Sequence, residues 1–152
     1  MDYLLDSNII VIYSRDNDIS NLIEQRYQLF NGNHRLFVSV VTLGEINAII
    51  KKLQLGEKRQ KNIQRILDSI NKIGINFAEI IDRYGDIDAF SQGKLPNKQV
   101  AFTARNMGKN DLWIAATSSV YDLVLVTTDK DFNHLDGEYL TLAYIDISSL
   151  GR

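Results

Sequence analysis

The sequence predicts an α/β fold, a three-layer α/β/α sandwich with a mainly parallel central sheet, formed by residues 1–152 as a single domain. Two observations lead to this prediction. Short apolar runs rich in β-branched residues alternate with longer segments whose apolar residues recur at helical spacing. These helical segments are long enough to act as crossover connections, which place neighbouring strands parallel and cover both faces of the sheet with helices.

The first part of the chain contains two predicted strands. Residues 3–5 (Tyr-Leu-Leu) are apolar and are followed by Asp-Ser-Asn, which predicts a buried strand that ends in a turn or helix cap. After a short apolar segment at 9–13, apolar residues between 19 and 30 recur at helical spacing, and we expect this helix to stop at 31–33 (Asn-Gly-Asn). The β-branched run at 36–41 predicts the second strand.

The middle of the chain is predominantly helical. A helix is expected to open at Thr42-Leu43-Gly44-Glu45 and to continue to about Leu53. Gly56 separates it from a second amphipathic helix that is predicted to run to about Ile73. Residues 74–77 form a candidate short strand.

The last part of the chain alternates helix and strand again. Residues 78–90 have helical spacing, and 91–99 contain the single proline and predict a loop. A strong helix starts at Asn110, and the strand at 123–127 ends in Thr-Asp-Lys-Asp. A last strand is predicted over 140–147, which completes the alternation expected for a parallel sheet.

The composition of the 152-residue chain excludes several classes of protein. It has no cysteine, so a disulfide framework, a thiolate zinc site and a cysteine nucleophile are excluded. No apolar run approaches the ~20 residues that a bilayer requires, and no signal-like segment follows Met1, so we expect a cytoplasmic protein. The net charge of −2 gives no overall basic footprint, but residues 51–72 hold seven basic and two acidic side chains, a net +5.

Four carboxylates are predicted to gather at one edge of the sheet. Asp6 follows the first strand and Asp129 follows the strand at 123–127. Glu45 lies one helical turn beyond the second strand, and Asp111 begins the helix that leads into the next one. Ligands of open α/β sheets bind outside the carboxyl ends of the strands, so these side chains are candidate site residues, with Asp131 as a possible substitute for Asp129.

Such a cluster indicates a divalent cation. Four neighbouring carboxylates cannot all stay ionised without a compensating positive charge. Mg²⁺ and Mn²⁺ prefer oxygen ligands and commonly share a site between carboxylates and substrate phosphate. Bound there, they lower the pKa of an attacking water and stabilise a leaving oxygen, so the cluster predicts phosphodiester hydrolysis.

Each carboxylate also has a purely structural interpretation. Thr42 and Glu45 match a capping box, and Asp111 suits the first turn of a helix because of the helix dipole. Asp6 could be a helix cap, and Asp129 or its neighbour could form a turn. The metal-site hypothesis depends on all of them sharing one location, which caps do not require.

These motifs resemble those of the PIN-domain family, and within it the VapC-type toxins of toxin–antitoxin pairs. The resemblance covers most of the chain. Four segments carry it, in the same order as in the family. They are Leu4-Leu5-Asp6-Ser7-Asn8-Ile9, Val38 to Glu45, Asn110-Asp111-Leu112-Trp113-Ile114-Ala115-Ala116-Thr117 and Leu125-Val126-Thr127-Thr128-Asp129-Lys130-Asp131-Phe132. Trp113 and Ser7 look like tolerated variants of the family pattern.

The resemblance implies a Mg²⁺- or Mn²⁺-dependent endoribonuclease, often a homodimer, that is silenced by a cognate antitoxin covering the acidic pocket. Carried over by position, it makes Asp6, Glu45 and Asp111 metal ligands and catalytic residues, with Asp129 completing the site. Ser7, Asn8 and Thr127 would then orient ligands or water.

Basic residues around the predicted site are candidates for contacts with the RNA backbone, which would make binding salt-dependent. They lie in the 51–72 stretch and in the 94–109 segment, and they are Lys51, Lys52, Lys94, Lys98, Arg105 and Lys109. The apolar residues of the 51–72 stretch are expected to face the core, with a partner surface as the other interpretation.

Other functions fit the sequence less well. A haloacid-dehalogenase-like phosphatase needs Asp-x-Asp after the first strand, where this chain has Asp-Ser-Asn; a receiver domain's acidic pair and lysine are also missing. No glycine-rich nucleotide loop is present, and His34 and His134 lie in polar turns, where we expect surface residues. The alternatives that stay open are a non-catalytic RNA- or protein-binding module of the same fold and a DNA-directed or structure-specific nuclease.

Overall fold

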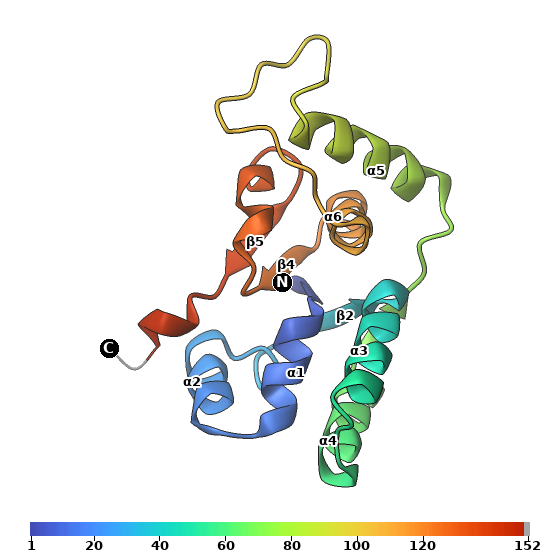
Figure 1. The fold of residues 1–152 in the computed structure, drawn as a ribbon. Coiled ribbons are helices and arrows are strands. Elements are labelled where there is room, and N and C mark those ends of the chain that lie inside the picture. The colour runs from blue at the N-terminus through green and yellow to red at the C-terminus, as the bar shows by residue number, and fades with distance from the viewer. Residues whose placement is uncertain (151–152) are drawn as a thin grey trace.

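The central sheet of the computed structural model, which describes residues 1–150, consists of five parallel strands (Figure 1). The strands lie side by side in the order β3-β2-β1-β4-β5. Their bounds are β1 Asp2–Leu5, β2 Arg35–Ser39, β3 Asn71–Ile73, β4 Val124–Thr127 and β5 Thr141–Tyr144. Every neighbouring pair is parallel, which confirms the predicted sheet.

Helices cover both faces of this sheet and create two hydrophobic cores. Adjacent residues of a strand point to opposite faces, so Leu4 packs into the core under α5 and α6, whereas Leu5 packs into the core under α1, α2 and α4. Leu125 and Val126 of β4 divide in the same way. The three-layer α/β/α prediction is therefore confirmed. The helices are α1 Ser7–Arg15, α2 Asp18–Tyr27, α3 Val40–Lys52, α4 Glu57–Asp68, α5 Ala78–Ser91 and α6 Lys109–Tyr121, with short 3₁₀ helices η1 Lys130–Leu135 and η2 Ile147–Ser149.

The strand order places a crevice between β1 and β4. From β1 the chain moves outward through β2 to β3 on one side, and then returns to build β4 and β5 on the other side. The connections that leave β1 and β4 therefore diverge, and the carboxyl ends of these two strands form the switch point at which open α/β sheets bind ligands. Asp6 follows the end of β1 directly, and Asp129 lies two residues after the end of β4.

The second strand is shorter than predicted. It ends at Ser39, whose side chain accepts a hydrogen bond from the Val41 N–H at 3.1 Å and so caps α3. Val40 and Val41 are thus helical although their β-branched side chains favour a strand. The capping-box interpretation of Thr42 and Glu45 is wrong, because Thr42 lies buried inside the helix.

Three other predicted elements also have wrong boundaries. The helix after Gly56 ends at Asp68 instead of about Ile73, and the short strand is residues 71–73 instead of 74–77, because this segment pairs with β2. The helix predicted over 19–30 ends at Tyr27. Gln28 adopts a left-handed conformation there, and the Glu24 carboxylate binds the backbone N–H groups of the two residues at 30–31.

Two glycine-to-alanine substitutions are expected to have opposite effects on stability. Gly85 lies inside α5, where an added Cβ would meet no atom within 4 Å, so Gly85→Ala should raise the free energy of unfolding by about 0.5–1 kcal/mol. At Gly32 an added Cβ would overlap with the Gln28 carbonyl oxygen, so Gly32→Ala should lower it by roughly 1–3 kcal/mol. Urea denaturation of both variants measures the difference; effects of the same sign would contradict this description of the two sites.

Candidate functional site

Five carboxylates from separate segments meet at the switch point of the sheet. Asp6 follows β1, Glu45 lies on α3, Asp111 is in the first turn of α6, and Asp129 and Asp131 follow β4. The carboxyl of Asp111 interacts electrostatically with the other four. The structure thus brings together the four predicted site residues, and Asp131 joins them.

Asp6 is the most deeply placed of the five, with 4% of its surface exposed. One carboxylate oxygen accepts a hydrogen bond from the Ser7 backbone N–H at 2.8 Å, and the other accepts one from the Thr127 hydroxyl at 2.7 Å. Burial raises the pKa of Asp6, and its hydrogen bonds oppose that shift without cancelling it. Asp6 therefore carries its negative charge at a cost that a nearby cation would relieve.

Thr127 connects Asp6 to the segment that follows β4. Its hydroxyl donates to Asp6 and accepts a hydrogen bond from the Asp129 backbone N–H at 3.0 Å. Asp129 in turn accepts from the Asp131 N–H at 2.9 Å. Near this chain of bonds, the Asn8 side-chain oxygen accepts from the Thr128 N–H at 3.4 Å. These hydrogen bonds hold the carboxyl ends of β1 and β4 in one relative position.

Glu45 faces the same site from α3, and only part of its carboxylate group is hydrogen-bonded. Its Oε1 atom is buried and has no hydrogen-bond partner among the described residues. Burial raises its pKa, the Asp6 charge adds to this shift, and a hydrogen bond from the Asn110 side chain opposes it. A buried carboxylate oxygen without a donor is costly, so it points to a ligand.

The carboxyl group of Asp111 is repelled by the charges of all four other acidic residues. Burial, followed by the charges of Asp6, Asp129, Glu45 and Asp131, raises the pKa of Asp111 to about 7. One carboxylate oxygen each from Asp111, Asp129 and Asp131 lie within 4.8 Å of one another. This carboxyl group therefore still binds a proton in a large share of the molecules at neutral pH, unless another positive charge replaces that proton.

The donor set fits a hard divalent cation. All the converging ligands are carboxylate oxygens, which Mg²⁺ and Mn²⁺ prefer. Two oxygen ligands on opposite sides of such an ion, each at about 2.0–2.2 Å, are roughly 4.0–4.4 Å apart, close to the limit of 4.8 Å within which the closest three carboxylate oxygens lie. Asp131, which the sequence offered only as a substitute for Asp129, is a member of this closest group.

Asp6 and Asp129 are both helix caps and members of the acidic site. Asp6 is the N-cap of α1, and Asp129 is the N-cap of η1. Capping uses one oxygen of each carboxylate. Asp129 keeps its second oxygen for another partner, so a cap and a ligand are compatible roles for the same side chain.

The predicted basic residues differ in how free they are to bind a ligand. Lys51, Lys52, Lys94 and Lys109 are exposed. Lys98 forms an ion pair with Glu138 at 2.9 Å, and Arg105 is half-buried with its Nε atom unpartnered among the described residues. Exposed ammonium groups can approach a nucleic-acid backbone at little cost, whereas Lys98 would first have to leave its partner.

The expectation that both histidines are surface residues is wrong. His134 is half-buried against Phe90 and Phe102, and its Nε2 atom lies 2.7 Å from the hydroxyl of buried Ser91. Burial lowers the pKa of His134, followed by the charge of Arg105. His34 is also half-buried and contacts the ring of Tyr3 edge-on. Flanking polar residues concealed these aromatic contacts.

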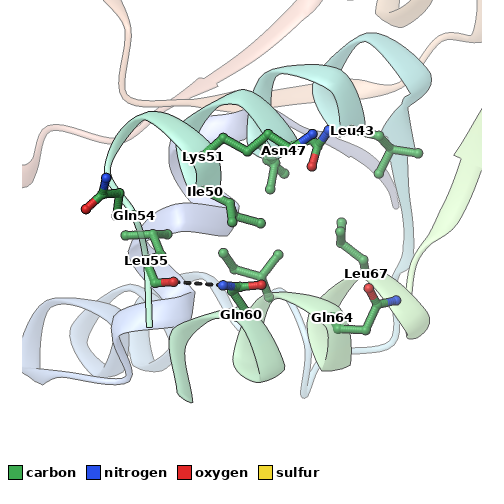
Figure 2. A pocket seen from close by; sticks show the side chains of 11 residues that line it. Leu43, Asn47, Ile50, Lys51, Gln54, Leu55, Gln60, Gln64 and Leu67 are labelled. Atoms are coloured by element: carbon green, nitrogen blue, oxygen red, sulfur yellow. Dashed lines mark hydrogen bonds between the residues drawn. The ribbon is translucent and has the colours of Figure 1, made fainter. Parts of the chain in front are cut away.

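A separate groove of about 620 Å³ lies between α3 and α4 (Figure 2). Ile50 of α3 and Leu67 of α4 are among the side chains that line it, and polar side chains such as Gln60 and Gln64 stand along α4. None of the five carboxylates lines this groove. The apolar residues of the 51–72 stretch mostly face the core as expected, since Ile63, Leu67 and Ile70 are buried; Leu53 is exposed.

The fold and the site define a class of protein: a parallel α/β domain with an acidic cluster at the switch point of its sheet. A family model for the PIN domain matches residues 3–138, and the chain belongs to this family. A search of curated proteins by sequence found no match. A membrane-spanning helix is not found within residues 1–150, because each helix there is too short or too polar to cross a bilayer.

Several solved structures, among them VapBC complexes, share the fold. VapBC2 from Rickettsia felis, bound to a DNA fragment from its promoter, is similar with a TM-score of 0.72 and 23% identity over 95% of this chain and 98% of that chain. VapBC-1 from nontypeable Haemophilus influenzae is similar with a TM-score of 0.66 and 26% identity, again over 95% of this chain and 98% of that chain. FitAcB from Neisseria gonorrhoeae is similar with a TM-score of 0.61 and 21% identity over 99% of this chain and 100% of that chain.

The crowding of carboxylates predicts that Asp111→Asn stabilises the metal-free protein clearly more at pH 8 than at pH 5. Asp111 has a pKa of about 7 in the folded state and an ordinary value near 4 when unfolded. Between these values the folded state holds the extra proton, so the free energy of unfolding falls as pH rises to about 7. The asparagine variant escapes this loss and should gain about 1–2 kcal/mol at pH 8, a value reduced for solvent screening.

Urea denaturation in EDTA at both pH values measures this effect. Asp122→Asn provides the matched control, because this residue lies at the other end of α6 in a left-handed conformation that asparagine also adopts. A gain of equal size at pH 5 and pH 8 would show that repulsion at Asp111 is not its origin.

Proposed function

We propose that this chain is a Mg²⁺- or Mn²⁺-dependent endoribonuclease that hydrolyses RNA phosphodiester bonds and acts in the cytoplasm as the toxin of a VapBC-type toxin–antitoxin pair. The observation that carries the proposal is the convergence of five carboxylates at the switch point, with a buried Glu45 oxygen that no described donor satisfies. Membership of the PIN-domain family supports it.

Asp6, Glu45 and Asp111 would hold the cation, with Asp129 and Asp131 completing the ligand set. When bound, such an ion lowers the pKa of a water molecule and stabilises the charge on a phosphodiester. Asp6 is suited to be the fixed ligand, because the Thr127 hydroxyl and the Ser7 N–H hold both of its oxygens. The raised pKa of Asp111 belongs to the metal-free site, where a bound cation would replace its proton and leave the carboxylate as a ligand.

The protein around the cluster would bind and orient the RNA. The exposed Lys52 and Lys109 lie near the Glu45 and Asp111 ends of the site in sequence, and both can neutralise backbone phosphates. Lys51, Lys94, Lys98 and Arg105 would extend this contact. Asn8 and Thr127 would orient the acidic groups through the hydrogen bonds that join the ends of β1 and β4.

We also propose a cognate antitoxin and a homodimer as protein partners. VapBC-1 of Haemophilus influenzae and VapBC2 of Rickettsia felis, which share the fold, are toxin–antitoxin pairs, and this supports the antitoxin. The dimer rests on the family resemblance alone, and light scattering of the purified chain tests it directly.

Asp6→Asn and Asp111→Asn should each lower metal-dependent RNA cleavage by at least about 100-fold. Even residues that only orient metal ligands cost 10–100-fold when they are changed, so direct ligands should cost more. The purified protein is incubated with a pool of structured and single-stranded RNAs in Mg²⁺, Mn²⁺ or chelator, with Asp122→Asn as the control. Cleavage that is indifferent to chelator, or equal in the variants, would refute the mechanism.

The same assay separates the alternatives. Cleavage of single-stranded DNA as fast as RNA would favour a DNA-directed nuclease. RNA binding without cleavage in any metal would favour a non-catalytic binding module.

Thr127→Val should lower cleavage or metal affinity by about 10–100-fold while keeping the side-chain shape. The substitution removes the hydroxyl that links Asp6 to the Asp129 backbone. Metal affinity is measured by calorimetry and folding by thermal denaturation. Thr117→Val is a suitable control, because Thr117 is also buried but bonds only to the Trp113 carbonyl in its own helix. An effect of the same size in both variants would contradict a role for Thr127 in holding Asp6.

A further inference from the structure

A second hollow of about 550 Å³ lies directly beside the acidic site. Glu45, Ala48 and Lys52 line it from α3, where they recur at helical spacing along one face. Asn110 and Trp113 line it from the first turns of α6, and Ile75 lines it from the segment after β3. The hollow therefore shares Glu45 with the carboxylate cluster.

We propose that this hollow binds an unpaired nucleobase of single-stranded RNA next to the cleavage site, with the indole of Trp113 as its stacking surface. The inference rests on the proposed function and adds a base-binding site beside the carboxylates and the residue that forms its stacking surface. A base in a duplex is stacked between its neighbours and cannot enter a side pocket, so the hollow selects for single strands.

Trp113 is held in a suitable position for stacking. It is half-buried, lines the hollow, and contacts the ring of Tyr84 with the ring centroids 4.3 Å apart at an angle of 45°. Its aromatic neighbour fixes the indole without covering it completely. Aromatic side chains that are fixed and partly exposed are the usual stacking surfaces for bases of single-stranded nucleic acids.

The remaining lining suits a nucleotide better than an apolar partner. Val40, Ile49 and Ile75 supply apolar walls, and Asn110 supplies amide groups that can donate to and accept from a base edge. The exposed ammonium group of Lys52 can pair with a phosphate. The core of a protein interface is depleted of charged residues, whereas this hollow contains both Glu45 and Lys52, which argues against a second copy of the chain as occupant.

The location also fits a base attached to the reacting phosphate. Asn110 immediately precedes Asp111 and hydrogen-bonds with Glu45, so one wall of the hollow consists of residues that belong to or touch the acidic cluster. A base is separated from its own phosphate by one sugar, and binding it here would place that phosphate beside the carboxylates. Recognition and positioning of the scissile bond would then be coupled.

Tryptophan fluorescence provides a direct test, since Trp113 is the only tryptophan of the 152-residue chain. The full chain carrying Asp111→Asn is titrated in EDTA, where cleavage is absent, with a ten-nucleotide single-stranded RNA. Binding is followed in parallel by polarisation of a label on the RNA. We expect the RNA to quench Trp113, and an oligomer with the same sugar–phosphate backbone but no bases, or the RNA in a duplex, to leave the fluorescence unchanged. Binding of the single strand without quenching would overturn the proposal.

Variants that fill or empty the hollow provide a second readout. Gly44 lines the hollow, and an added Cβ meets no atom within 4 Å, so Gly44→Leu should extend a side chain into it; the melting temperature checks that the variant folds. Gly44→Leu and Trp113→Ala should weaken binding of the single strand by roughly 5- to 100-fold, and Trp113→Phe should retain most of the binding. Tyr121→Ala is the control, because this exposed aromatic residue ends α6 far from Asp111 and should leave binding unchanged.

The outcomes distinguish this inference from the proposed function. If the unmodified chain cleaves RNA in metal and folded Gly44→Leu and Trp113→Ala cleave with unchanged KM, the nuclease stands and the base site is refuted. If the RNA quenches Trp113 but no metal supports cleavage, the base site stands and the nuclease fails. Trp113 fluorescence that changes with protein concentration but not with RNA would assign the hollow to a second copy of the chain and refute the proposal.

Discussion

Mutual repulsion among carboxylates is the constraint on which this structure depends. Five acidic side chains meet where β1 and β4 end, and their charges raise the pKa of Asp111 to about 7. A fold selected for stability alone would disperse them, since like charges at short range lower stability. The two hydrophobic cores on either side of the sheet hold the backbone in place against this repulsion, and a bound cation would remove it.

The backbone resists the repulsion because capping and site formation use the same side chains. Asp6 caps α1, Asp129 caps η1, and the Thr127 hydroxyl joins the two. Each cap satisfies a backbone N–H that would otherwise lack a partner, so the acidic groups are fixed by interactions that the fold needs in any case. The structural and functional interpretations of these residues are therefore complementary, and hydrogen bonds within the protein position Asp6 and Asp129 without a ligand.

The sequence predicted the layers of the fold and the gathering of the acidic residues, but not the contacts between segments. The strand endings before Asp6 and Asp129 were visible because apolar runs give way to carboxylates there. The end of β2 was misplaced because Val40 and Val41 favour strands locally, and the Ser39 cap decides otherwise. Strand order, the unpartnered Glu45 oxygen and the Ser91–His134 contact depend on residues distant in sequence, which no local pattern encodes.

Helix α3 connects the chemistry of the site to its selectivity. Glu45 faces the carboxylate cluster, and the residues one and two turns later, Ala48 and Lys52, line the hollow in which we place a nucleobase. Because a helix is stiff over two turns, the wall of the hollow that α3 provides is held at a fixed separation from the Glu45 carboxylate. A base stacked on Trp113 and a phosphate beside Glu45 would then have a fixed separation too. A substrate that cannot turn a base out of its stack would then bind with its phosphate displaced from the carboxylates, so discrimination would appear in the rate of cleavage as well as in affinity.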